Sequence, residues 1–275
     1  MDLREFANPV LFLQQASPLL EEHEAENNLM LAIAARLATA YSSPAPFLAT
    51  LEEDNQVLAA ALRTPPHRLI LSRSPALAIA ILADHLARHH HHLPGIIGPV
   101  ESTALFVTAW KKLSRQSIRP GRSLRIFQLD RVIPPPTPSA SLVEATPDDF
   151  DLLLNWVRAF NTETGQTSPA DERPFIQTAL AEHRLYLSKH PHPVSLAACS
   201  GPTPRGIRIN LVYTPPAFRN RGYASATVAA LSQKLLDSGR RFCFLFTDLA
   251  NPTSNSIYKK IGYHPVCDFR EYLFT

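Results

Sequence analysis

The chain has 275 residues, of which 45% are hydrophobic and 19% charged, a balance typical of a globular protein with one large or two medium domains. The formal charge of +3 argues against a general nucleic-acid binder, which carries a basic surface. No apolar run approaches a membrane span, and the first residues lack the basic-then-apolar order of a signal peptide. We therefore expect a cytoplasmic protein that binds neither nucleic acid nor membrane.

Cysteines and glycines narrow the kinds of site. Cys199, Cys243 and Cys267 are too few and too scattered for a disulfide framework or a zinc site, so we expect free thiols in apolar surroundings and no metal. Glycine is scarce, and neither G-x-G-x-x-G nor G-x-x-x-x-G-K-[ST] occurs. The two commonest nucleotide-binding loops are therefore excluded.

The first half of the chain predicts strands alternating with helices. Apolar periodicity favours helices over residues 29–41, 76–89 and 102–113. The expected strands cover residues 47–52, 57–63, 68–72, 95–100 and 124–132. The histidine run 89–92 follows the second helix, where basic side chains suit the negative helix end, so we interpret it as a solvated terminus.

A proline-rich segment, residues 134–139, separates the two halves. Such a segment stays extended and cannot continue a helix or a central strand. We therefore predict a boundary near residue 140, with an N-terminal domain of residues 1–135 and a C-terminal domain of residues 140–275.

The second half predicts the order strand, two helices, three strands, helix, strand, helix, strand. Thr146 and Pro147 are typical of a helix start, and Gly239 and Gly262 of helix ends. The expected strands cover residues 142–145, 184–188, 193–199, 206–214 and 242–246, with one or two more up to residue 274; the helices cover residues 146–160, 170–183, 225–238 and 252–260. This order predicts an α/β sandwich with a mixed sheet. Because the first half roughly repeats it, we hypothesise an internal repeat.

The turn between the strand 206–214 and the helix 225–238 suits an anion. The first N–H groups of a helix lack intrahelical partners and attract negative charge. Gly222 lets the backbone come close to a ligand, Ala224 is small, and Arg219 and Arg221 add positive charge. The alternative is an ordinary strand-to-helix turn with two solvated arginines.

The pattern R-x-x-G-x-A in residues 219–224, after a strand and before a long helix, resembles the defining motif of the GNAT superfamily of N-acetyltransferases. Residues 251–263 are similar to the second signature of that superfamily and close with a Gly-aromatic pair. The resemblance covers residues 142–275 and implies a mixed central sheet flanked by helices. With the repeat, it implies two tandem GNAT-like domains. The first would be degenerate, since residues 73–76 contain no glycine.

The resemblance implies an N-acetyltransferase that moves an acetyl group from acetyl-CoA to an amine. The N–H groups of residues 221–225 would hold the pyrophosphate, and that of Val212 would face the thioester oxygen. Tyr258 matches the catalytic tyrosine that would protonate the leaving thiolate. The implied cofactor-binding residues are Val212, Tyr213, Thr214, Arg219, Asn220, Arg221, Gly222, Tyr223, Ala224, Ser225, Asn251, Asn255 and Tyr258.

Several alternatives stay open. Asn251 can serve as a helix cap alone and Tyr258 as a core residue. Candidate general bases are Glu144 and Asp248, while His183, His190 and His192 have no motif behind them. The acceptor could be a small molecule, a protein N-terminus or a lysine, and the donor could carry a longer acyl group. A CoA-binding sensor or regulatory protein without turnover is the rival from another class.

Overall fold

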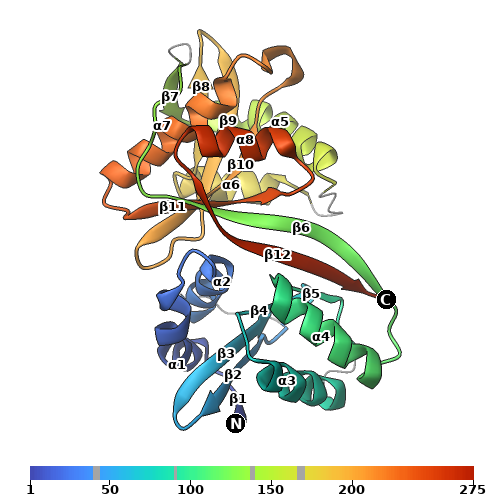
Figure 1. Ribbon diagram of the computed structural model, residues 1–275. Helices are drawn as coiled ribbons and strands as arrows, with labels where there is room; N and C mark the ends of the chain where they lie inside the picture. Colours follow the sequence, from blue (N-terminus) through green and yellow to red (C-terminus); the bar gives the residue numbers. More distant parts are fainter. Residues whose placement is uncertain (40–43, 90–91, 137–139, 166–170) are drawn as a thin grey trace. The chain divides into compact units, whose positions relative to one another are not determined.

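The computed structural model describes residues 1–39, 44–89, 92–136, 140–165 and 171–275. The chain forms two compact units, each discontinuous in sequence (Figure 1). Unit 1 contains Met1–Ile126, Phe246–Asn251 and Pro265–Thr275, and unit 2 contains Phe127–Leu245 and Pro252–His264. A single cut near residue 140 does not produce these units, because the end of the chain belongs to unit 1. The boundaries 1–135 and 140–275 stay a prediction.

Unit 1 is a mixed sheet with a pair of helices on each face (Figure 1). Across the sheet the strands are β1 (Asp2–Glu5), β2 (Phe47–Glu53), β3 (Gln56–Arg63), β4 (Leu69–Leu71), β5 (Gly95–Pro99), β12 (His264–Phe274) and β6 (Ile118–Leu129). β4 and β5 pair in parallel, whereas β5 and β12 are antiparallel. One face is covered by α1 (Pro9–Glu22) and α2 (Asn28–Thr39), the other by α3 (Ala76–His89) and α4 (Val100–Leu113).

The apolar run in β3 is explained by burial on both faces. Ala59 and Ala61 pack in the core under α3 and α4, and Ala60 and Leu62 in the core under α1 and α2. Successive side chains of a strand point to opposite faces, so a strand covered on both sides loses its polar alternation.

Unit 2 has the same plan. Its strands, in order across the sheet, are β7 (Ser141–Glu144), β8 (Leu185–Lys189), β9 (Pro193–Ser200), β10 (Gly206–Tyr213) and β11 (Phe242–Asp248). Residues 242–245 of β11 belong to unit 2 and residues 246–248 to unit 1. β10 and β11 are parallel and the other pairs antiparallel. A short helix η1 (Pro147–Asp149) leads into α5 (Phe150–Glu163), which covers one face with α6 (Arg173–Ala181). The turn η2 (Pro216–Phe218) precedes α7 (Tyr223–Asp237), which covers the other face with α8 (Pro252–Lys260).

The two halves of the chain share one element order: strand, two helices, three strands, helix, strand, helix, strand. The predicted mixed sheet flanked by helices is confirmed, and the predicted recurrence of its order is observed. The helix at Ala76–His89 has the predicted bounds. The sequence patterns predicted neither the strand β1 nor the helix α1. Two residues of the histidine run, 90 and 91, lie outside the described residues, as do 137–139 and 166–170. None of the helices in the described part combines the length and apolar character needed to cross a lipid bilayer.

Candidate functional site

A β-bulge interrupts β10, the strand that leads into the arginine loop. The register with β9 shifts between Asn210 and Tyr213, so that Leu211 and Val212 together oppose one residue of β9. Leu211 has a φ of 49°, in the left-handed region that branched side chains seldom adopt. The bulge therefore holds a strained backbone near the end of a largely buried strand.

The bulge also changes which side chains face which helices. Before it, Ile207 and Ile209 pack in the core under α7 and α8. After it, Leu211 and Tyr213 pack in the core under α5 and α6. Without an inserted residue, all four odd-numbered side chains would lie on one face. Val212 thereby comes to pack against the α7–α8 core, which also contains Tyr258.

The parallel pairing of β10 ends before the bulge. In the described chain its register with β11 runs from Gly206–Phe242 to Arg208–Phe244. Backbone N–H and C=O groups beyond that point need other partners. An extended ligand that carries amides can supply them by adding along the strand edge.

The loop after β10 leads into α7, whose first turn has no side-chain cap. Gly222 occupies the N-cap position of α7 with a φ of 79°, and no side chain caps the helix there. Asn220 also has a positive φ, 61°. Tyr223, Ala224 and Ser225 form the first turn, and the N–H groups of a first helical turn have no partner within the helix. Together with the helix dipole, these groups make an anion site.

Arg219 is already held by protein groups. Its Nη2 donates to both carboxylate oxygens of Glu163 at 2.7 Å, and its Nε donates to the Thr214 carbonyl at 2.9 Å. Its Cζ lies 5.8 Å from the centroid of the Tyr213 ring. Arg219 therefore ties the loop to the last residue of α5. Arg221 is exposed and has no ion pair among the described residues.

Asn255 and Tyr258 lie three residues apart in α8 and so share one face of that helix. The Tyr258 ring is buried beside Tyr263, with ring centroids 5.9 Å apart. Burial raises the pKa of Tyr258 to about 12, so the phenol is protonated at neutral pH. In the described chain its hydroxyl has no hydrogen-bond partner, whereas the Tyr263 hydroxyl lies 2.9 Å from Ser232 Oγ. Asn251 belongs to unit 1, where its N–H donates to the Asp248 carbonyl at 3.0 Å.

The candidate base Glu144 lies at another part of unit 2, together with His183. Glu144 contacts His183 beside the edge strand β7, and β8 and β9 separate β7 from β10. Three strand spacings amount to roughly 14 Å, too far for a hydrogen bond to an amine at β10. Asp248 belongs to unit 1. His190 lies near the loop, with its ring 6.0 Å from that of Tyr223.

One residue that the sequence interpretation missed is Asn210, directly before the bulge. Its Nδ2 donates to Ser200 Oγ at 3.0 Å, while its Oδ1 is buried without a partner in the described part of the chain. Such an acceptor is normally satisfied by a water or a ligand. The sequence did carry a signal for this residue, because a side-chain amide stands within an otherwise largely apolar strand.

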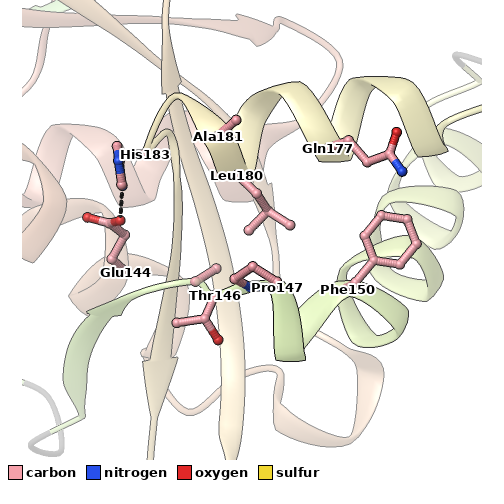
Figure 2. A pocket seen from close by; sticks show the side chains of 9 residues that line it. Glu144, Thr146, Pro147, Phe150, Gln177, Leu180, Ala181 and His183 are labelled. Atoms are coloured by element: carbon pink, nitrogen blue, oxygen red, sulfur yellow. Dashed lines mark hydrogen bonds and ion pairs between the residues drawn. The ribbon is translucent and has the colours of Figure 1, made fainter.

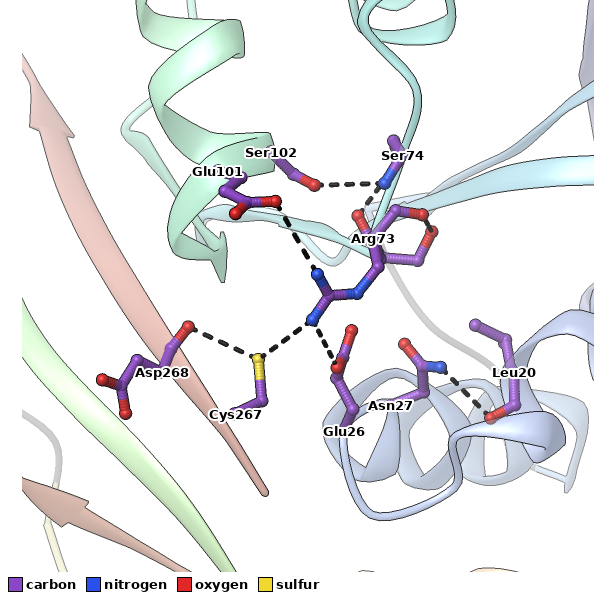
Figure 3. Close-up of polar contacts among 10 residues, drawn as sticks. Leu20, Glu26, Asn27, Arg73, Ser74, Glu101, Ser102, Cys267 and Asp268 are labelled. Atoms are coloured by element: carbon purple, nitrogen blue, oxygen red, sulfur yellow. Dashed lines mark hydrogen bonds and ion pairs between the residues drawn. The ribbon is translucent and has the colours of Figure 1, made fainter. Parts of the chain in front are cut away.

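In unit 1, the polar groups of the corresponding loop bond to neighbouring protein side chains. Between β4 and α3, the Ser74 N–H donates to Ser102 Oγ at 3.1 Å. Arg73 pairs with Glu26 at 3.0 Å and Glu101 at 3.8 Å, and its Nη2 lies 3.7 Å from Cys267 Sγ (Figure 3). Unit 1 therefore does not repeat the open helix start of unit 2.

The cysteines are free, with Cys199 and Cys243 buried and Cys267 half-buried. Burial raises the pKa of the Cys243 and Cys267 thiols to about 12. Within the described residues, no group of three or more His, Cys, Asp and Glu side chains is arranged to hold a metal ion.

Comparison with known proteins places the fold. Residues 193–273 match the family model of FR47-like proteins, a range that contains the bulge, the loop and α8. No curated protein matches the chain in sequence. A GNAT-family acetyltransferase of Colwellia psychrerythraea superposes with a TM-score of 0.63 at 11% identity, covering 100% of both chains. A GCN5-related N-acetyltransferase of Sphaerobacter thermophilus gives a TM-score of 0.63 at 16% identity over 98% of this chain and 94% of its own.

A third structure bears on the repeat. A tandem GNAT protein from the clavulanic acid biosynthesis pathway superposes with a TM-score of 0.58 at 13% identity, covering 100% of this chain and 98% of its own. The fold is thus a GNAT-type fold of the tandem kind. The solved structures that share this fold are GNAT acetyltransferases, the fold that the two motifs implied, and the match to FR47-like proteins covers residues 193–273.

Proposed function

We propose that this chain is an acyl-CoA-dependent N-acetyltransferase, which moves an acetyl group from acetyl-CoA to an amine by direct attack in a ternary complex. The observation that carries the proposal is the bulged β10 leading into α7, whose N-cap is Gly222 in the left-handed conformation. A strand edge whose pairing with β11 ends before the bulge, followed by an open helix start, matches a ligand with an amide-bearing arm and a diphosphate.

Acetyl-CoA would bind through main-chain groups. The N–H groups of residues 221–225 would hold the pyrophosphate, with Arg221 as the exposed cation beside it. The pantetheine arm would pair along residues 211–214. The Val212 N–H would donate to the thioester oxygen, which gains negative charge as the amine attacks, so that a fixed donor lowers the barrier.

In the reaction, the neutral amine nitrogen attacks the thioester carbon, the C–S bond breaks, and CoA leaves as a thiolate. Tyr258 would donate a hydrogen bond to that sulfur. Its pKa of about 12 makes it a weaker acid than a thiol, whose pKa is near 8.5. The phenol would therefore stabilise the thiolate by hydrogen bonding, and the proton lost by the nitrogen would finally neutralise the sulfur.

The acceptor is an amine of a small molecule or of a protein. Asn210 lies directly before the bulge with a buried, unpartnered Oδ1 in the described chain, so it can accept a hydrogen bond from an N–H of the bound ligands. This residue gives the proposed acceptor site its first candidate contact.

Calorimetric titration with acetyl-CoA, succinyl-CoA and free CoA tests the donor, and a screen of amines with a thiol-release readout tests transfer. We expect acetyl-CoA to bind and at least one amine to be acetylated. Binding of acetyl-CoA without transfer to any amine would favour a sensor or regulatory protein. Preference for succinyl-CoA would favour a longer acyl group, and failure to bind any of the three would reject the proposal.

A further inference from the structure

A pocket of about 680 Å³ opens at one side of unit 2, within the size range of small-molecule sites (Figure 2). It lies where β7 passes into η1 and α5 and where α6 ends. Its walls include the apolar side chains of Ala145, Pro147, Phe150 and Leu180. Figure 2 shows Phe150 and Leu180 on one side and the pair Glu144–His183 on the other.

The polar end of the pocket carries one carboxylate, that of Glu144, in contact with a histidine. Glu144 Oε1 contacts His183 Nδ1, and the side chains are 42% and 73% exposed. Among the described residues that line the pocket, Glu144 is the carboxylate and no lysine or arginine is present. Arg184, next along the chain, is paired with Glu182 at 2.5 Å. A cation is therefore favoured at this end and an anion disfavoured.

The pocket is separate from the proposed acetyl-transfer site. It borders the edge strand β7, and β8 and β9 lie between it and β10. No residue of the arginine loop, α7 or α8 lines it. A ligand here would not reach the thioester.

We propose that this pocket binds a small organic ammonium ion with an apolar body about the size of one aromatic ring. The ammonium group donates to the Glu144 carboxylate beside His183. The apolar body lies against Pro147, Phe150 and Leu180, where it buries surface that is otherwise open to water. The proposal concerns a second site and does not rest on the proposed acetyl transfer.

The probe is N,N-dimethylbenzylamine, which is cationic at neutral pH and, as a tertiary amine, cannot give a stable acetylation product. Its titration into the full chain without CoA, followed by protein NMR, is compared with that of neutral benzyl alcohol and anionic phenylacetate. We expect the cation to bind roughly three- to tenfold more tightly than the alcohol, and the anion most weakly, since a half-exposed charge pair contributes modestly.

Three variants locate the binding. Glu144→Gln should remove the preference for the cation and leave benzyl alcohol unchanged. Asp237→Asn, the control at an exposed carboxylate outside the pocket, should change neither. Leu180→Trp should fill the pocket and weaken both ligands, with thermal unfolding used to verify that each variant is folded.

Equal affinity for cation and alcohol, a preference that survives Glu144→Gln, or binding that Leu180→Trp leaves intact would overturn the proposal. Loss of binding on saturation with acetyl-CoA would do the same, because it would place the probe at the transfer site. The result is independent of whether the chain acetylates any amine.

Discussion

Gly222 and Leu211 hold the backbone of the candidate site in left-handed conformations, with φ of 79° and 49°. For glycine this conformation costs little, but for other residues it costs roughly 1–3 kcal/mol. Gly222→Val should therefore lower stability by that order and weaken acetyl-CoA at least about tenfold, because the N–H groups of α7 can no longer be presented in the same way. Calorimetry and thermal unfolding measure the two effects.

The matched control is Gly239→Val, at the other end of the same helix. Gly239 also has a positive φ, 97°, and a Cβ there would meet nothing within 4 Å. It should cost similar stability and leave acetyl-CoA affinity unchanged. If both variants bind acetyl-CoA as the unmodified chain does, Gly222 has no role in the cradle.

Tyr258 and Tyr263 form a second matched pair, since both phenols are buried in one core. Tyr258→Phe should lower turnover at least about tenfold with little change in acetyl-CoA affinity, because a donor to the leaving sulfur acts in the transition state. Tyr263→Phe removes a hydrogen bond to Ser232 and should cost about 1 kcal/mol of stability without a comparable loss of turnover. Steady-state kinetics of both variants test this prediction. If the two variants have the same turnover, Tyr258 serves only in packing.

At the scale of elements, the arginine loop is attached to α5 through Arg219 and Glu163. Since the guanidinium is already engaged, we expect it to position the loop and not to bind phosphate directly. Glu163→Gln and Arg219→Gln should weaken acetyl-CoA by similar factors, and the double variant should be no weaker than either single one.

Arg221→Gln is the variant to compare with Arg219→Gln. As an exposed cation beside the helix start, Arg221 should contact phosphate, and its loss should weaken binding and reduce the dependence on salt. If Glu163→Gln instead leaves acetyl-CoA binding unchanged or strengthens it while Arg219→Gln weakens it, Arg219 is itself a phosphate ligand. Titrations at two salt concentrations separate these cases.

Local sequence signals located most elements of unit 2, because capping residues and apolar periodicity act over a few neighbouring residues. They placed the arginine loop between a strand and a helix, as the structure does. They missed β1, a short edge strand whose residues 2, 4 and 5 are charged, and α1, which holds Pro18 within the helix. The bulge at Leu211 was also missed, because a leucine between Asn210 and Val212 gives no local signal for a left-handed conformation.

At the scale of the whole molecule, the strand pair that is most widely separated in sequence and matters most for prediction joins the end of the chain to unit 1. β12 is antiparallel to β5 in unit 1, so residues near 270 complete a core built from the first 126 residues. No local pattern specifies such a partner, since it is chosen by which sheet edge and which apolar surface need covering. The predicted boundary near residue 140 was placed at the proline-rich segment. A single boundary cannot describe a chain whose last residues belong to unit 1.

Phe274 tests the contribution of that returning strand. It is buried, and its ring centroid lies 6.1 Å from that of Trp110 in a stacked arrangement. Phe274→Ala should destabilise unit 1 by roughly 3–5 kcal/mol, because it leaves a cavity against α4. Native-state hydrogen exchange should then show lost protection in α3 and α4, with α5 and α6 much less affected. Phe175→Ala, at a phenylalanine 43% exposed in unit 2, should cost far less. Equal loss of protection in both units would mean that they unfold together and that the returning strand stabilises the molecule as one cooperative body.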